Sequence, residues 1–336
     1  MDFIKGIGAL LLTLCAFSVF SMKCPKGDKA MGGMADAAVA TFLVEAILKY
    51  ICGDFAGIAF LGEVGATSGG MGAVASAALV GISMGTSPVF AVASAAAVAG
   101  FGILPGFIAA YFVHFILRLI LKYLPAGLDV IVGALVAAIL SRGIAIVVDP
   151  GVNSVLSTVG TSIAAAAEQS PILMGLILGG LMKPICTSPL SSMALTAMLG
   201  LTGLPMGIAA IACFGGSFTN ALIFKGLKLG DNSKVIAVML EPLTQADIIT
   251  KNPIPIYASN AVGGALAGVG AAILGIVNNA PGTASPIPGL LAPFAFNPPM
   301  KVILALAIAA VGGTIAGIIG VIVFRKLGFG NKEIPA

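Results

Sequence analysis

The sequence has 336 residues, of which 59% are hydrophobic and only 9% charged, and its formal net charge is +4. Ordinary soluble domains carry roughly 25% charged residues, so this chain lacks the polar surface that a water-soluble fold requires. The composition therefore excludes a soluble globular domain and, without a basic stripe, gives no support to nucleic-acid binding. It predicts an all-α, polytopic integral membrane protein.

Residue types that build metal centres and catalytic sites are scarce. The chain has one histidine, His114, and its five cysteines show no CxxC or Cys/His spacing, so neither a zinc site nor a disulfide framework is indicated. Walker, dinucleotide-binding and HExxH motifs are also absent from the sequence. We expect no metal or cofactor, find no evident catalytic residues, and assign His114 to helix packing or the membrane interface.

Apolar stretches follow one another along the whole chain. The first, residues 7–22, resembles a signal peptide but lacks a clear cleavage site, so we expect a retained first helix, with a cleavable signal as the alternative. Several later stretches are shorter than the roughly 20 residues that a full span needs, so these are expected to be half-helices or re-entrant hairpins. We expect about ten transmembrane helices in all. The later candidates are approximately 34–52, 71–84, 89–103, 105–124, 126–147, 171–184, 189–201, 204–224, 253–277 and 300–324.

Three segments are expected not to span the membrane. Residues 150–169 and 225–251 mix polar and apolar positions, which favours interfacial helices. Residues 281–298 are rich in proline and apolar without helical continuity, which favours a re-entrant hairpin sheltered by protein. Lysines in 225–251 and basic residues after 324 place these loops in the cytoplasm.

The chain repeats one pattern at an offset of about 100 residues. Thr-Ser-Pro, a small-residue helix, Leu-Pro and Ile-Ala-Ala occur in 85–110 and again in 186–210. We expect one transmembrane domain, 1–336, with repeat units at approximately 60–124 and 171–224. Internal repeats with interrupted helices are the best sequence indication of a transport site near the bilayer midplane.

Each Thr-Ser-Pro predicts a new helix start, because proline is tolerated in the first helical turn. Free N–H groups there can hold an anionic or hydroxyl-rich ligand. Thr86 and Ser87 in one copy, and Thr187 and Ser188 in the other, are therefore candidate substrate-binding residues. Helix caps inherited by duplication are the alternative.

Further polar residues lie in apolar surroundings. Glu63 is a candidate to face a cavity, with a loop carboxylate in water as the alternative. Thr219, Asn220 and Asn260 are candidate solute contacts, although interhelical hydrogen bonds would also explain them. Glu45 is expected to form an ion pair with the lysine four residues later.

The duplicated Thr-Ser-Pro, the "GEVGATSGG" segment and the proline-rich "GTASPIPGLLAPFAFNP" hairpin carry a resemblance over nearly the whole length. The chain resembles the membrane-embedded IIC (EIIC) components of the sugar phosphotransferase system, in particular the branch with the perfringolysin-regulator-like proteins. The resemblance implies a homodimer in the cell membrane, a sugar site moved by an elevator-like motion, and a separate IIB (EIIB) protein. Where better-known members have an acid in the late hairpin, this chain offers only hydroxyls, including that of Ser285.

These observations lead to an EIIC-like permease for a small polar solute such as a sugar, polyol or anion. The alternatives are a membrane sensor that acts through a cytoplasmic partner and an ion-coupled carrier that works without phosphorylation.

Overall fold

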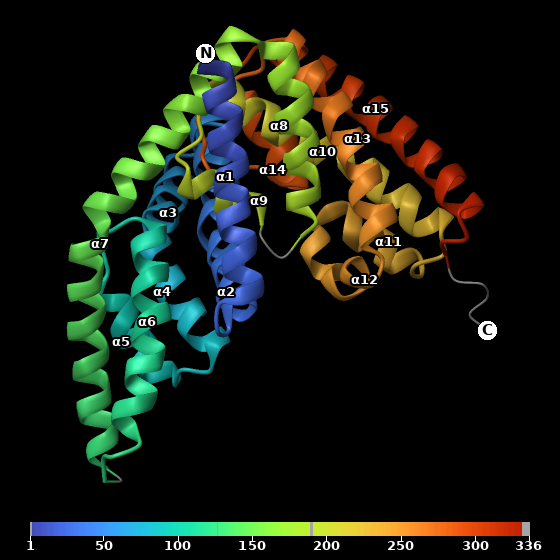
Figure 1. Cartoon of the computed structure of the whole chain (residues 1–336). Helices are drawn as coiled ribbons and strands as arrows, with labels where there is room; N and C mark the ends of the chain where they lie inside the picture. The colour runs from blue at the N-terminus through green and yellow to red at the C-terminus, as the bar shows by residue number, and fades with distance from the viewer. Residues whose placement is uncertain (1, 126, 189–190, 331–336) are drawn as a thin grey trace. The chain divides into compact units, whose positions relative to one another are not determined.

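The computed structural model describes residues 2–125, 127–188 and 191–330 (Figure 1). Among these residues it is almost entirely helical and contains no strand, which confirms the all-α prediction. Seven helices there are long and apolar enough to cross a membrane, or eight if a bent pair counts as one span. This is fewer than the expected ten, because apolar helices such as α5 (Pro88–Ala97) and α8 (Pro171–Cys186) are too short.

The chain divides into two compact units. Unit 2 is formed by Ala9–Thr161 with Ala197–Gly200, and unit 1 by Ser162–Thr196 and Leu201–Ala336 with the first eight residues. The first Thr-Ser-Pro copy therefore lies in unit 2 and the second in unit 1. The repeat itself stays a prediction.

Unit 2 contains the N-terminal helices and most of the long α7, up to Thr161. Its helices are α1 (Asp2–Lys23), whose first residues belong to unit 1, α2 (Gly27–Ala38), α3 (Ala59–Gly70), α4 (Gly72–Met84), α5, α6 (Ile103–Leu121) and α7 (Leu128–Gln169). The bent pair is α3 and α4, which meet at 55°. Helix α4 packs against both α2 and α6. Phe90, Val113, Leu117 and Ala137 form a buried cluster where α5, α6 and α7 meet.

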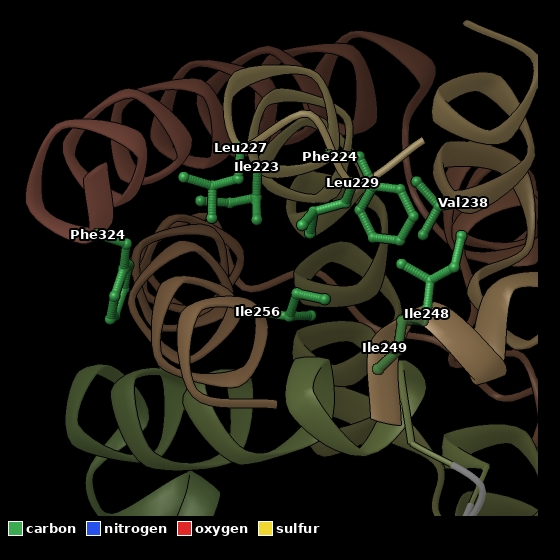
Figure 2. Close-up of a cluster of buried hydrophobic side chains, with 9 residues drawn as sticks. All are labelled: Ile223, Phe224, Leu227, Leu229, Val238, Ile248, Ile249, Ile256 and Phe324. Atoms are coloured by element: carbon green, nitrogen blue, oxygen red, sulfur yellow. The ribbon is translucent and has the colours of Figure 1, made fainter. Parts of the chain in front are cut away.

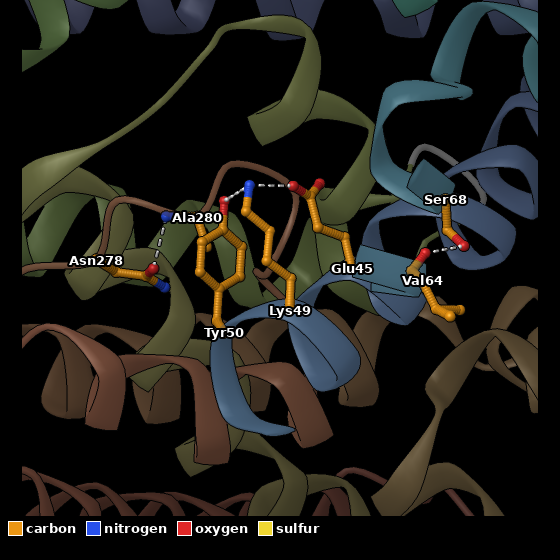
Figure 3. Close-up of polar contacts among 7 residues, drawn as sticks. All are labelled: Glu45, Lys49, Tyr50, Val64, Ser68, Asn278 and Ala280. Atoms are coloured by element: carbon orange, nitrogen blue, oxygen red, sulfur yellow. Dashed lines mark hydrogen bonds and ion pairs between the residues drawn. The ribbon is translucent and has the colours of Figure 1, made fainter. Parts of the chain in front are cut away.

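Helix α2 continues into two π-helical segments, Val39–Leu43 and Ala46–Phe55. The predicted ion pair is confirmed there: Lys49 Nζ donates to Glu45 Oε1 at 2.8 Å and also approaches the Tyr50 hydroxyl at 3.4 Å (Figure 3). An i,i+4 pair of this kind stabilises the helix by a few tenths of a kcal/mol. Glu45 and Lys49 therefore need no functional explanation.

Helix α7 is one continuous element of 42 residues with Pro150 inside it. At 1.5 Å per residue it is about 63 Å long, twice the roughly 30 Å hydrocarbon core of a bilayer. The sequence predicts a span that ends near 147 and a separate segment 150–169, whereas the helix continues through the proline. The interfacial position of 150–169 stays a prediction, and the length of α7 is compatible with it.

Unit 1 is built around a helix pair that meets backbone to backbone. Its elements are α8, α9 (Ser192–Met198), α10 (Gly203–Gly226), α11 (Asn232–Leu240), α12 (Ala246–Lys251), α13 (Pro253–Ile273), α14 (Pro286–Leu291) and α15 (Pro299–Lys326). A Cβ added at Gly264 or Gly268 would collide with the carbonyl oxygen of Gly179 or Gly175, respectively. Glycines four residues apart on both helices thus allow α8 and α13 to touch.

The predicted cytoplasmic segment 225–251 folds against one end of unit 1. It contains the end of α10, then α11 and α12. Asp231 is the N-cap of α11, and its carboxylate accepts a hydrogen bond from Lys234 N at 2.9 Å. Nine apolar side chains hold these elements together (Figure 2): Ile223, Phe224, Leu227, Leu229, Val238, Ile248, Ile249, Ile256 and Phe324. Residues 225–251 are therefore packed into the folded unit 1 by these buried side chains.

Residues 274–298, between α13 and α15, contain the predicted hairpin. Asn297 acts as a backbone partner: its Oδ1 accepts from Val277 N at 3.0 Å and its Nδ2 donates to Val277 O at 2.7 Å. Asn278 Oδ1 accepts from Ala280 N at 2.9 Å (Figure 3), and Asn278 Nδ2 donates to Thr283 Oγ1 at 2.8 Å. Side-chain amides thus supply the hydrogen bonds that a helix would otherwise provide. A re-entrant position in the membrane remains a prediction.

Candidate functional site

The second Thr-Ser-Pro copy follows the end of α8. Thr187 Oγ1 donates to Pro184 O at 2.8 Å and Ser188 Oγ donates to Ile185 O at 2.9 Å, so both hydroxyls close the last turn of α8. Pro189 lies outside the described residues, and the next helix, α9, begins at Ser192. The hydroxyls of this copy thus cap a helix end.

Lys183, one turn before this motif, is fully buried. Its Nζ donates to Cys213 O at 3.2 Å, and the side chain lies against Gly216 of α10 and Gly264 of α13. Ionisable residues inside membrane helices are costly and usually functional. Sequence reasoning missed Lys183, although a lysine inside the apolar run "LILGGLMKPIC" was a visible signal.

The start of α9, the middle of α10 and the hairpin converge beside this lysine. Ser192 Oγ donates to Ala284 O, and Cys213 Sγ lies 3.8 Å from Ser192 Oγ. The next residue in the hairpin, Ser285, is buried, and its hydroxyl has no hydrogen-bond partner among the described residues. A chain of contacts through Cys213 and Ser192 therefore links Lys183 to the hairpin at Ala284.

Asn220 of α10 and Asn260 of α13 face each other in the core of unit 1. Asn260 Nδ2 donates to Asn220 Oδ1 at 2.6 Å, and Thr219 Oγ1 donates to Gly313 O of α15 at 2.8 Å. The interhelical hydrogen bonds considered for these residues are thus present. Asn220 Nδ2, Asn260 Oδ1 and Ser259 Oγ are nevertheless buried without a partner among the described residues. Such orphaned groups require an explanation, because each is costly in an apolar interior.

The first Thr-Ser-Pro copy is a helix start, as predicted. Helix α4 ends at Met84, Gly85 has φ 93°, and Ser87 is the N-cap of α5 with Pro88 in its first turn. The turn opens on a cavity of about 580 Å³ in unit 2. Thr86 Oγ1 lies 2.7 Å from Nδ1 of His114, which is buried on α6.

Glu63 is exposed on α3 and does not line this cavity. The structure therefore brings Thr86 and Ser87 together with His114, and does not add Glu63 to them. A contact between Glu63 and the solute stays a prediction.

Glu241, which ends α11 and precedes a 3-10 turn, gives unit 1 a dependence on pH. Burial raises the pKa of Glu241 to about 7, and its Oε1 accepts from Leu243 N at 3.4 Å. An unfolded glutamate titrates near 4.3, so the folded state binds the proton more tightly. Stability should then fall as pH rises from about 4.5 to about 7, by at most about 3.5 kcal/mol, and stay level above that.

Glu241→Gln should remove this dependence while keeping an oxygen for Leu243 N. Thermal unfolding measured from about pH 4 to about pH 8, a range that extends beyond both ends of the transition, tests it. Glu168→Gln, at an exposed position, should unfold like the wild type. An unchanged pH profile in Glu241→Gln would show that another group titrates.

Comparison with known protein families identifies the family to which this chain belongs. The model of the family described as "Phosphotransferase system, EIIC" matches residues 28–335. A search of curated proteins and a search of solved structures each found no match. The match covers nearly the whole chain, including both Thr-Ser-Pro copies and the hairpin. The chain therefore belongs to the phosphotransferase system EIIC family, as a multi-pass transporter component of the cell membrane that works with other components of that system.

Proposed function

We propose that the protein is a permease that binds a small polar solute, such as a sugar, a polyol or an anion, inside unit 1. The observation that carries this proposal is the set of buried side-chain polar atoms in unit 1 that have no hydrogen-bond partner among the described residues: Asn220 Nδ2, Asn260 Oδ1, Ser259 Oγ and Ser285 Oγ. A hydroxylated solute offers both donors and acceptors, so it could satisfy groups of either kind.

The polar groups that would receive the solute come from four parts of unit 1. Thr187 and Ser188 contribute at the end of α8, Thr219 and Asn220 on α10, Asn260 on α13, and Ser285 in the hairpin. Lys183 adds an amino group that can donate to a solute oxygen. Thr86, Ser87 and Glu63 lie in unit 2, so they are proposed contacts of a ligand there and not of the solute held inside unit 1.

We further propose alternating access of the elevator type, in a homodimer. The division of the chain into two compact units supports this, because an elevator-type transporter needs one domain that moves across the membrane and one that stays in place. Phosphorylation of the solute would require a separate EIIB protein.

Ser285→Ala offers a sharp test, because the Ser285 hydroxyl has no hydrogen-bond partner in the part of the chain that the structure describes, and its removal should not lower stability. Wild-type protein in detergent should unfold at a higher temperature with its solute, found by screening sugars, polyols and small organic acids. Ser285→Ala should unfold at or above the wild-type temperature without solute and lose most of the shift with it. Thr158→Ala, on the exposed face of α7, should keep the full shift.

Uptake into proteoliposomes, with and without an EIIB protein and an ion gradient, then shows how transport is driven. A solute panel that shifts neither the unfolding temperature nor the uptake of the wild-type protein would contradict the permease proposal.

A further inference from the structure

The cavity of unit 2 is lined by cations without a matching acid. Ten residues line it, among them Lys26, Arg118 and Lys122, and none of the ten is Asp or Glu. No ion pair joins these three side chains to a carboxylate anywhere in the described part of the chain. Three like charges around one cavity repel each other unless an anion lies between them.

A relay of hydrogen bonds fixes one wall of this cavity. Lys26 Nζ donates to Met84 O at 2.5 Å and lies 2.8 Å from His114 Nε2. An ammonium group can only donate, so Nε2 is the acceptor and the ring proton is on Nδ1. Nδ1–H then donates to Thr86 Oγ1, which leaves the proton of the Thr86 hydroxyl for a ligand.

The positive end of α5 points to the same space. Ser87 is its N-cap, makes no side-chain capping hydrogen bond and lines the cavity, as does Phe90. The free N–H groups of a ten-residue helix add about half a positive charge. Partial burial and the nearby Arg118 and Lys29 lower the pKa of Lys26, as expected for a cation that lacks a counterion.

We propose that this cavity binds a phosphate group, held by Lys26, Arg118 and Lys122, by the hydroxyls of Thr86 and Ser87, and by the first turn of α5. A phosphate oxygen is a strong acceptor and matches donors that converge from several directions. Arg118 and Lys122 lie exposed at the end of an apolar helix, where both a soluble phosphate and a phospholipid headgroup can reach them. The inference rests on the proposed function only in that Thr86 and Ser87 face a ligand.

Binding to the full chain tests the proposal without any transport step. In neutral detergent without lipid, inorganic phosphate should raise the unfolding temperature in a saturable way if the ligand is soluble. If the ligand is a lipid, the shift should appear instead when phosphatidylglycerol is added to phosphatidylcholine vesicles that contain the protein. Either result supports a phosphate site and identifies its source.

Arg118→Gln is the main variant, because Arg118 is exposed and outside the hydrogen-bond relay. It should weaken binding about tenfold, the effect of one charge-assisted hydrogen bond. Lys23→Gln makes an equal change of charge in the last turn of α1, outside the cavity, and should bind like the wild type.

Two results would overturn the proposal: no saturable shift with either probe, or equal weakening by Lys23→Gln and Arg118→Gln, which would indicate diffuse attraction. Since solute uptake is measured separately, loss of this site and failure of the permease proposal can be told apart.

Discussion

Gly264→Ala should lower the unfolding temperature of the purified protein strongly. A Cβ at this position would collide with Gly179 O and with Lys183 Cβ, so α8 and α13 would have to separate. Backbone atoms cannot rotate away as a flexible side chain can. Overpacking of this kind costs about 1 to 3 kcal/mol, which exceeds the gain of up to about 1 kcal/mol that alanine brings to a helix.

Gly143→Ala is the matched control, because Gly143 is also inside a helix but a Cβ there meets no atom within 4 Å. It should unfold at or slightly above the wild-type temperature, since only helix propensity changes. Measured in the same detergent, the two variants should shift in opposite directions. Equal shifts would mean that α8 and α13 are not in backbone contact.

Lys183→Met should have opposite effects on stability and on transport. Methionine resembles lysine in length and removes a buried amino group whose desolvation is costly, so the unfolding temperature should rise. The partner it leaves, Cys213 O, still accepts a hydrogen bond from Ser217 Oγ at 3.4 Å. If Lys183 contacts the solute, uptake into proteoliposomes should fall about tenfold or more, as for the loss of a charge-assisted hydrogen bond.

Lys225→Met, at an exposed position in the last turn of α10, controls for the loss of one charge and should leave both quantities unchanged. A Lys183→Met protein that is less stable and still transports normally would assign the lysine a purely structural role. Uptake and unfolding must therefore be measured on the same preparation.

Composition was enough to predict the helical membrane class, because apolar surface on this scale leaves no alternative. It could not predict the surroundings of single polar residues. Glu63 and Lys183 both occur in apolar, glycine-containing runs, yet Glu63 is exposed and Lys183 is fully buried. The difference arises from Gly216 and Gly264, which are distant in sequence and make room for the lysine.

The two Thr-Ser-Pro copies show a second limit. Proline rules predict the start of α5 correctly at Ser87, because a helix start is a local property. They could not predict that Thr86 meets His114, since a contact between residues 28 apart depends on how α4 and α6 pack. Likewise, the pairing of Asn297 with Val277 needs two segments brought together by the fold.

The hydrogen bonds between Asn297 and Val277 affect what a movement of the hairpin would cost. A bare peptide group moving through hydrocarbon would have to shed water at a cost of several kcal/mol, on the order of 2 to 7. Asn278 and Asn297 already supply hydrogen bonds to the backbone of Val277 and Ala280, so these groups need no water as a partner. If the hairpin moves as the elevator proposal requires, these peptide groups would therefore have no water to lose or regain.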